Sequence, residues 1–248
     1  MRKWRRRFQW EKLFPWKKGF PWRIAGRILD RRAIMIYFAA WLLFFAVTPG
    51  HKGAMAILGG FSPQESRGMD ILGIIRWNLC VLPPVAVSIL FMDVEMGVLR
   101  VYTMVRSGSM KKWFLARLLG IAAANLVYLL LFVGIAEIGM GSGDYKRNGF
   151  GLFLAVFFLH SFLMSVFSVA LCGKNRRVHK AVVFYLLVEG IMVVIGDNFP
   201  RTAACLPPYW GMIQQVGGSS TGYLFGIIIL SAVIIAVSAV FIKKGLRA

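Results

Sequence analysis

The stretch FMDVEMGVLRVYTMVRSGSMKKWFLARLL, residues 91–119, joins two apolar segments and carries both acidic and basic side chains. Around it, the 248-residue chain is 58% hydrophobic, only 16% charged, and has a formal net charge of +20. Soluble domains are roughly 45–50% apolar. The composition therefore indicates a membrane protein, in which residues 91–119 form a polar connection between two membrane-spanning segments.

Six segments are predicted to cross the membrane as helices, some only with their flanking residues, because a spanning helix needs about 20 apolar residues. Their ranges are 33–48, 71–92, 114–136, 150–172, 181–196 and 223–242. The first and fifth are short and need flanking residues, a thinner bilayer or shielding by neighbouring helices. We expect an all-α integral membrane protein with a six-span domain at 33–242, a basic segment at 1–32 and a basic tail at 243–248.

The orientation of these spans follows from their basic connections, because Lys and Arg are retained on the cytoplasmic side. With the N-terminus inside, the cytoplasmic segments hold 24 of the 30 Lys and Arg residues, and the opposite connections hold 5. The remaining one, Arg76, lies near the outer interface, where its side chain is expected to snorkel toward water. Both termini are therefore predicted to be cytoplasmic.

The N-terminal segment contains a hexad repeat of aromatic residues with Lys and Arg between them. Its four tryptophans, spaced six apart, are Trp4, Trp10, Trp16 and Trp22. This composition suits the headgroup layer of an anionic leaflet and predicts a membrane-interface anchor; a mobile basic tail is the alternative. Nucleic acid is not expected as a partner, since only a short tether separates this segment from the first span. From 20 to 32 the pattern becomes an amphipathic interfacial helix, with Arg23 and Arg27 on one face.

The connection after the second span has a one-sided apolar stripe at helical spacing. The stripe consists of Val94, Val98, Val101, Tyr102 and Val105. Asp93 and Glu95 are predicted to lie at the N-terminal end of this helix, where the helix dipole favours carboxylates, and Ser109 is a candidate cap for the next span. Such a helix needs a partner surface, which is either another polypeptide, the inner ends of the protein's own spans, or the membrane.

In these features the chain resembles the membrane subunits of type-2 ABC exporters. The resemblance covers nearly the whole chain: six spans in about 250 residues, an amphipathic helix before the first, Glu95 after the second, and then LRVYTMVRSGSMKKWFLARLL. The outer stretch DNFPRTAACLPPYWGMIQQVGGSSTG is similar to the family's short re-entrant helices. The resemblance implies a bacterial plasma-membrane permease that pairs with a second permease subunit, either the same chain or a homologue. It also implies a coupling helix that docks on a separate ATPase, with contacts from Glu95, Val98, Leu99, Val101, Tyr102, Val105 and Arg106.

No sequence of the form G-x-x-x-x-G-K-[ST] occurs in the chain, so it cannot be its own P-loop ATPase. The chain is therefore expected not to be an enzyme, and ATP and Mg²⁺ are expected in the partner ATPase. The three histidines form no H-E-x-x-H motif, and the three cysteines form no C-x-x-C, so no metal site is predicted. The resemblance suggests an amphipathic or hydrophobic substrate, such as an antimicrobial peptide, a drug or a lipid-like molecule.

Glu189 lies near the middle of the predicted fifth span, where a carboxylate facing lipid would cost a few kcal/mol. It should therefore face the bundle or a cavity. The candidate polar neighbours from other spans are Asn78, Asn125, His160 and Ser165. Glu189 is then either part of a substrate or proton pathway or a hydrogen-bonded structural carboxyl. Two alternatives to the permease are an accessory or immunity subunit, and an intramembrane enzyme or proton-coupled carrier that uses Glu189.

Overall fold

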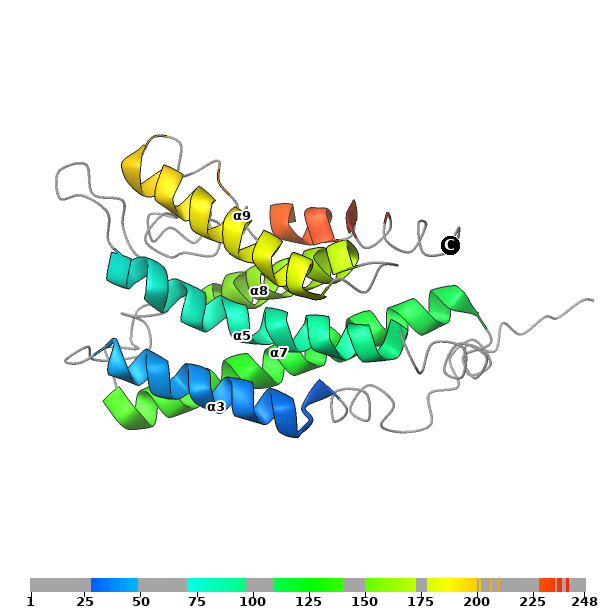
Figure 1. The fold of residues 1–248 in the computed structure, drawn as a ribbon, viewed down its shortest axis with the longest axis horizontal. Helices are drawn as coiled ribbons and strands as arrows, with labels where there is room; N and C mark the ends of the chain where they lie inside the picture. The colour runs from blue at the N-terminus through cyan, green and yellow to red at the C-terminus, as the bar shows by residue number, and fades with distance from the viewer. Residues whose placement is uncertain are drawn as a thin grey trace, which may run out of the picture.

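The computed structural model describes five long stretches of the chain and a few shorter ones, and the regular secondary structure in them is helical. The described residues are 28–48, 71–96, 109–140, 150–172, 178–199, 201, 206, 209, 228–234, 236–237 and 240. The helices are α3 (Arg31–Ala46), α5 (Ile71–Met96), α7 (Met110–Met140), α8 (Phe150–Cys172) and α9 (Val178–Asn198), and residues 228–234 are also helical (Figure 1).

Three of these helices, α5, α7 and α9, are long and apolar enough to cross a membrane, and α8 contains a shorter apolar stretch, Leu154–Ala170. The all-helical fold is thus confirmed for the described residues, whereas the number of six spans stays a prediction. The range 150–172 coincides with α8. The segments predicted at 114–136 and 181–196 are each extended at both ends in α7 and α9. The hexad tryptophans, Arg23 and Arg27 lie outside the described residues.

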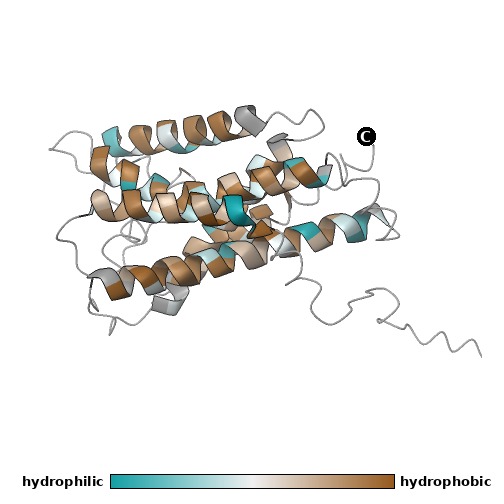
Figure 2. Cartoon of the chain, turned by 60° about the horizontal axis from the view of Figure 1, so that its bottom comes forward, coloured by the Kyte–Doolittle hydropathy of each residue, from teal (hydrophilic) through white to brown (hydrophobic). Residues whose placement is uncertain are grey.

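The central helix of the bundle is α5, which packs against α3, α7, α8 and α9 (Figure 1). Its buried side chains include Trp77, Val81, Val85 and Ile89. The outer faces of the other helices carry large exposed apolar side chains. Figure 2, which colours the ribbon by hydropathy, is brown along much of these helices. Phe38 on α3, Leu130 on α7 and Leu187 on α9 are each more than half exposed. Exposed apolar surface of this extent suits a lipid environment.

Two adjacent prolines, Pro83 and Pro84, lie inside α5, and the helix continues through them. Pro83 has no backbone N–H, so the carbonyl of Leu79 four residues earlier loses its helical donor. The Tyr128 hydroxyl of α7 donates to that carbonyl at 3.4 Å. In a membrane-spanning helix, neighbouring helices can satisfy backbone groups that proline frees. Tyr128 is itself fully buried, so this bond ties α7 to the centre of α5.

Polar side chains start two of the helices. The N-cap of α3 is Asp30, whose Oδ1 accepts a hydrogen bond from the Ala33 backbone N–H at 2.9 Å. The amphipathic helix predicted from 20 to 32 therefore does not run unbroken into α3. Ser109 Oγ accepts from the Lys112 N–H at 3.2 Å, so its predicted capping role at the start of α7 is confirmed.

At the other end of the bundle, side chains and backbone tie separate segments together. Arg76, which was predicted to snorkel, is half-buried, and its Nε donates to the carbonyl of Val47, just after α3, at 3.0 Å. The Tyr209 hydroxyl donates to the Val193 carbonyl of α9 at 2.7 Å. A Cβ at Gly196 would clash with the Tyr209 ring, so glycine is what permits this close approach. Burial, and to a smaller extent the Asp197 carboxylate, raise the pKa of Tyr209.

Candidate functional site

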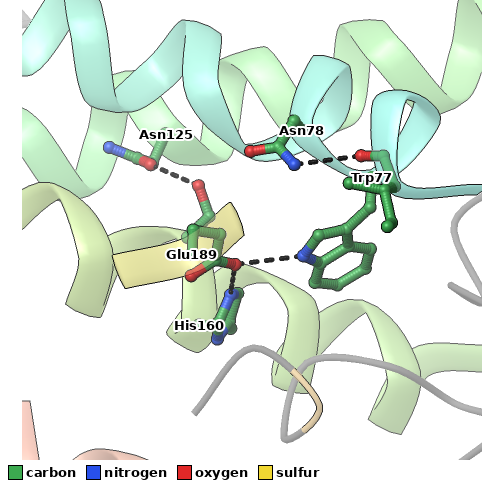
Figure 3. A network of polar contacts seen from close by, with 7 residues as sticks. Trp77, Asn78, Asn125, His160 and Glu189 are labelled. Atoms are coloured by element: carbon green, nitrogen blue, oxygen red, sulfur yellow. Dashed lines mark hydrogen bonds and ion pairs between the residues drawn. The ribbon is translucent and has the colours of Figure 1, made fainter. Parts of the chain in front are cut away.

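Glu189 lies at the meeting point of α5, α8 and α9 and is completely buried. Its Oε1 accepts a hydrogen bond from Trp77 Nε1 of α5 at 3.0 Å. His160 Nε2 of α8 lies 3.2 Å from the same oxygen, so the histidine and the carboxylate form a hydrogen-bonded pair (Figure 3). The prediction that Glu189 faces the bundle is confirmed. Of its candidate polar neighbours, His160 is the one the structure brings into contact with it.

Aromatic rings enclose this contact on the α5 and α8 side. The Trp77 ring meets Phe157 edge to face, with 5.6 Å between centroids, and its centroid is also 5.6 Å from that of the His160 ring. Trp77, Phe157 and His160 are each buried almost completely. Buried charge in such surroundings is unfavourable unless a counter-charge or hydrogen bonds compensate it. The one ion-pair partner of Glu189 among the described residues is His160.

The centre is not fully hydrogen-bonded within the described part of the chain. Glu189 Oε2 and His160 Nδ1 are both buried and have no hydrogen-bond partner there. The buried hydroxyl of Tyr185, one helical turn before Glu189 on α9, is also without one. Buried polar atoms nearly always have partners, so three such atoms around one carboxylate mark this site as unusual.

Asn125 belongs to a separate polar cluster between α7 and α8. Its Oδ1 accepts hydrogen bonds from Ser161 Oγ at 2.8 Å and Ser165 Oγ at 3.3 Å. Its Nδ2 donates to the Ile121 carbonyl at 2.9 Å within α7. These bonds use both ends of the amide, and the cluster therefore joins two helices without an orphaned atom on Asn125. Asn78 instead donates to its own helix, at the Ile74 carbonyl.

A second buried carboxylate, Glu95, lies in the last turn of α5. The helix predicted at 71–92 continues to Met96 as α5, so Asp93 and Glu95 lie near its end and not, as predicted, at the start of a new helix. The C-terminal end of a helix disfavours carboxylates, but Arg117 of α7 compensates Glu95. Arg117 donates from Nε and a terminal nitrogen to Glu95 Oε2, at 3.1 and 2.6 Å.

The Glu95–Arg117 pair is held by its surroundings. Both side chains are at most 6% exposed. The guanidinium carbon of Arg117 lies 4.7 Å from the centroid of the Trp113 ring, in cation–π geometry. Trp113 is itself buried, and its backbone N–H donates to the Ser109 carbonyl at the start of α7. The pair therefore fixes the end of α5 to the first turns of α7, on either side of residues 97–108.

The remaining coupling residues, Val98, Leu99, Val101, Tyr102, Val105 and Arg106, lie outside the described residues and stay predictions. Beside Glu95, a cavity of about 250 Å³ opens between the start of α3 and the end of α5. Its walls are apolar at Ile28, Val87 and Phe91, and charged at Arg32 and Asp93. Within the described ranges, no group of three or more His, Cys, Asp or Glu side chains could hold a metal ion.

Sequence reasoning missed Trp77, Ser161 and Arg117. Trp77 and Ser161 sit inside apolar runs, where a tryptophan or serine gives no signal of its own. Arg117 was counted only as a basic residue in a cytoplasmic connection. Its position inside the predicted third span could have identified it. An arginine buried in such an apolar segment needs a carboxylate partner.

Comparison of the chain with family models, curated proteins and solved structures finds no match. The functional interpretation therefore depends on the chain's own geometry. Within the described ranges, that geometry provides a buried ion pair at the end of α5 and, in the middle of the bundle, a buried carboxylate with one oxygen that has no hydrogen-bond partner.

Proposed function

We propose that the chain is a membrane-spanning permease subunit of an ATP-driven exporter in a bacterial plasma membrane. It works with a separate P-loop ATPase and with a second permease subunit, and it moves an amphipathic or hydrophobic substrate. Both termini and residues 97–108 lie on the cytoplasmic side in this proposal, since the basic residues gather there.

The observation that carries the proposal is the anchoring of residues 97–108 at both ends. Glu95 precedes this connection, Arg117 follows it, and their buried ion pair ties α5 to α7. A segment that transmits force from an ATPase to membrane helices needs rigid attachment at its ends. The ion pair supplies such an attachment, because separating α5 from α7 would leave both charges without their partners.

Docking itself is assigned to the apolar stripe at Val98, Val101 and Val105, together with Leu99, Tyr102 and Arg106. An apolar helix face with a charged residue at its edge fits a hydrophobic groove on a partner protein. In this proposal the exposed apolar faces of α3, α7 and α9 contact lipid or the second permease subunit. The basic aromatic segment at 1–32 binds anionic lipid.

The test is co-purification from native membranes in mild detergent. We expect a P-loop ATPase to be recovered in stoichiometric amount with the unmodified chain and to be lost with Val98→Glu or Val101→Glu. The matched control is Ile138→Glu, which places the same charge on a residue 88% exposed near the far end of α7. Recovery of a folded chain without any ATPase would contradict the proposal, and a complex that survives both valine substitutions would move the docking surface elsewhere.

A further inference from the structure

The hydrogen bonds around Glu189 are unevenly distributed between its two oxygens. Trp77 and His160 both reach Oε1, whereas Oε2 is buried with no hydrogen-bond partner among the described residues (Figure 3). The second ring nitrogen of His160, Nδ1, is likewise buried without a hydrogen-bond partner among the described residues. An unpartnered buried atom on each member of one ionisable pair calls for an explanation, and a ligand that binds there is one.

The smallest ligand that these two atoms can bind is a proton. The contact between His160 Nε2 and Glu189 Oε1 needs one proton between the two groups. A further proton can bind at Nδ1 or at Oε2 while the bonds to Oε1 from Trp77 and His160 persist. Uptake and release therefore require no rearrangement of the helices that hold the pair, apart from access to water.

The charge of the site makes this proton important. Ionised Glu189 with doubly protonated His160 is neutral overall, whereas loss of one proton leaves a net negative charge among buried apolar groups. Such a charge is costly unless water enters.

Among the residues that the structure describes, no other group near the pair takes over this role. The nearby titratable side chains on the surrounding helices are Cys80 of α5, Tyr128 of α7 and Tyr185 of α9, and these types are uncharged at neutral pH. On α8 the titratable group facing the site is His160 itself. Arg76 precedes Trp77 but donates to the Val47 carbonyl beyond α3.

We propose that Glu189 and His160 form a binding site for one proton, which is exchanged when α9 moves relative to α5 and α8. Glu189 is on α9, and its two hydrogen-bonded neighbours are on α5 and α8. Of the three helices that can span a membrane, α9 is the least buried, with 33% of its apolar window inside the bundle against 56% for α5. Of these three helices it therefore has the largest share of its apolar window outside the bundle.

The site can be tested on the full-length chain in lipid nanodiscs with ¹⁵N-labelled histidine. The chain has three histidines, so a His51→Gln, His179→Gln background leaves His160 as the single signal. We expect its ring nitrogens to shift between the singly and doubly protonated forms as pH changes. Glu189→Gln should lose the doubly protonated form, because the carboxylate that stabilises it is gone. Ser165→Ala, which removes a buried hydroxyl of α8 bonded to Asn125, should leave the shifts unchanged.

Glu189→Asp is the second variant, in case the glutamine protein does not fold; it keeps the charge but shortens the side chain, and should reduce the doubly protonated fraction. A His160 ring that stays in one form at every pH, or that responds identically in the folded Glu189 variants, overturns the inference. The measurement needs no ATPase, so its failure is distinguishable from failure of the proposed permease function.

Discussion

Glu95 and Glu189 are both buried carboxylates of one helical bundle, but their partners differ in kind. Glu95 faces an arginine, which is always charged and which gives one oxygen two hydrogen bonds. Glu189 faces a histidine and a tryptophan, and its second oxygen has no hydrogen-bond partner within the described ranges. The first arrangement fixes a charge in place, and the second allows the charge to change. Burial alone therefore does not reveal what a carboxylate does.

The largest expected effect comes from breaking the fixed pair. Arg117→Leu leaves Glu95 buried without its cation, and we expect the free energy of unfolding to fall by about 3–5 kcal/mol. Chemical denaturation in detergent, followed by the loss of helical circular dichroism, measures it. The double variant Glu95→Leu with Arg117→Leu should recover most of this loss, since both charges are removed. Equal destabilisation in the single and double variants would mean that packing of the arginine stem, and not its charge, holds α5 to α7.

A smaller loss of stability is expected from substitutions at two glycines of α9. One glycine lies near the end of the helix and the other beside Glu189, so the two variants compare the packing at these places. Gly196→Ala forces a Cβ into the Tyr209 ring and should destabilise the protein by roughly 1–3 kcal/mol. Gly190→Ala meets nothing within 4 Å and should be neutral or slightly stabilising. Thermal unfolding of both variants provides the comparison. A strongly destabilising Gly190→Ala would show that the helix is packed closely at Glu189, against the mobility that proton exchange requires.

The smallest loss of stability is expected at the prolines of α5, which lie along the helix between Trp77, the partner of Glu189, and Glu95. Tyr128→Phe removes the donor to the Leu79 carbonyl and should cost about 0.5–1.5 kcal/mol. Pro83→Ala restores a backbone donor to that carbonyl, so Tyr128→Phe should cost less in a Pro83→Ala background. A double-mutant cycle in the same unfolding assay measures this difference. Strict additivity of the two changes would mean that the hydroxyl does not substitute for the missing N–H.

The sequence predicted the helices well because each is a long apolar run, and the ends of α8 coincide with prediction. It also predicted that Glu189 turns inward, since lipid excludes a carboxylate. It could not select His160 over Asn125 or Asn78, because that choice depends on how α8 and α9 rotate against α5. The register of Arg117 opposite Glu95 likewise depends on the geometry of residues 97–108, and hydrophobic periodicity does not determine it.

The claim that one carboxylate is fixed and the other exchanges a proton can be tested directly by infrared difference spectroscopy. The purified chain and its Glu95→Gln and Glu189→Gln variants are each compared before and after acidification in the His51→Gln, His179→Gln background, with the ring bands of singly and doubly protonated histidine as the readout. Our account predicts that Glu189→Gln deletes the acid-induced change at His160 and that Glu95→Gln leaves it intact. Loss of the change in Glu95→Gln, or its persistence in Glu189→Gln, would contradict the account.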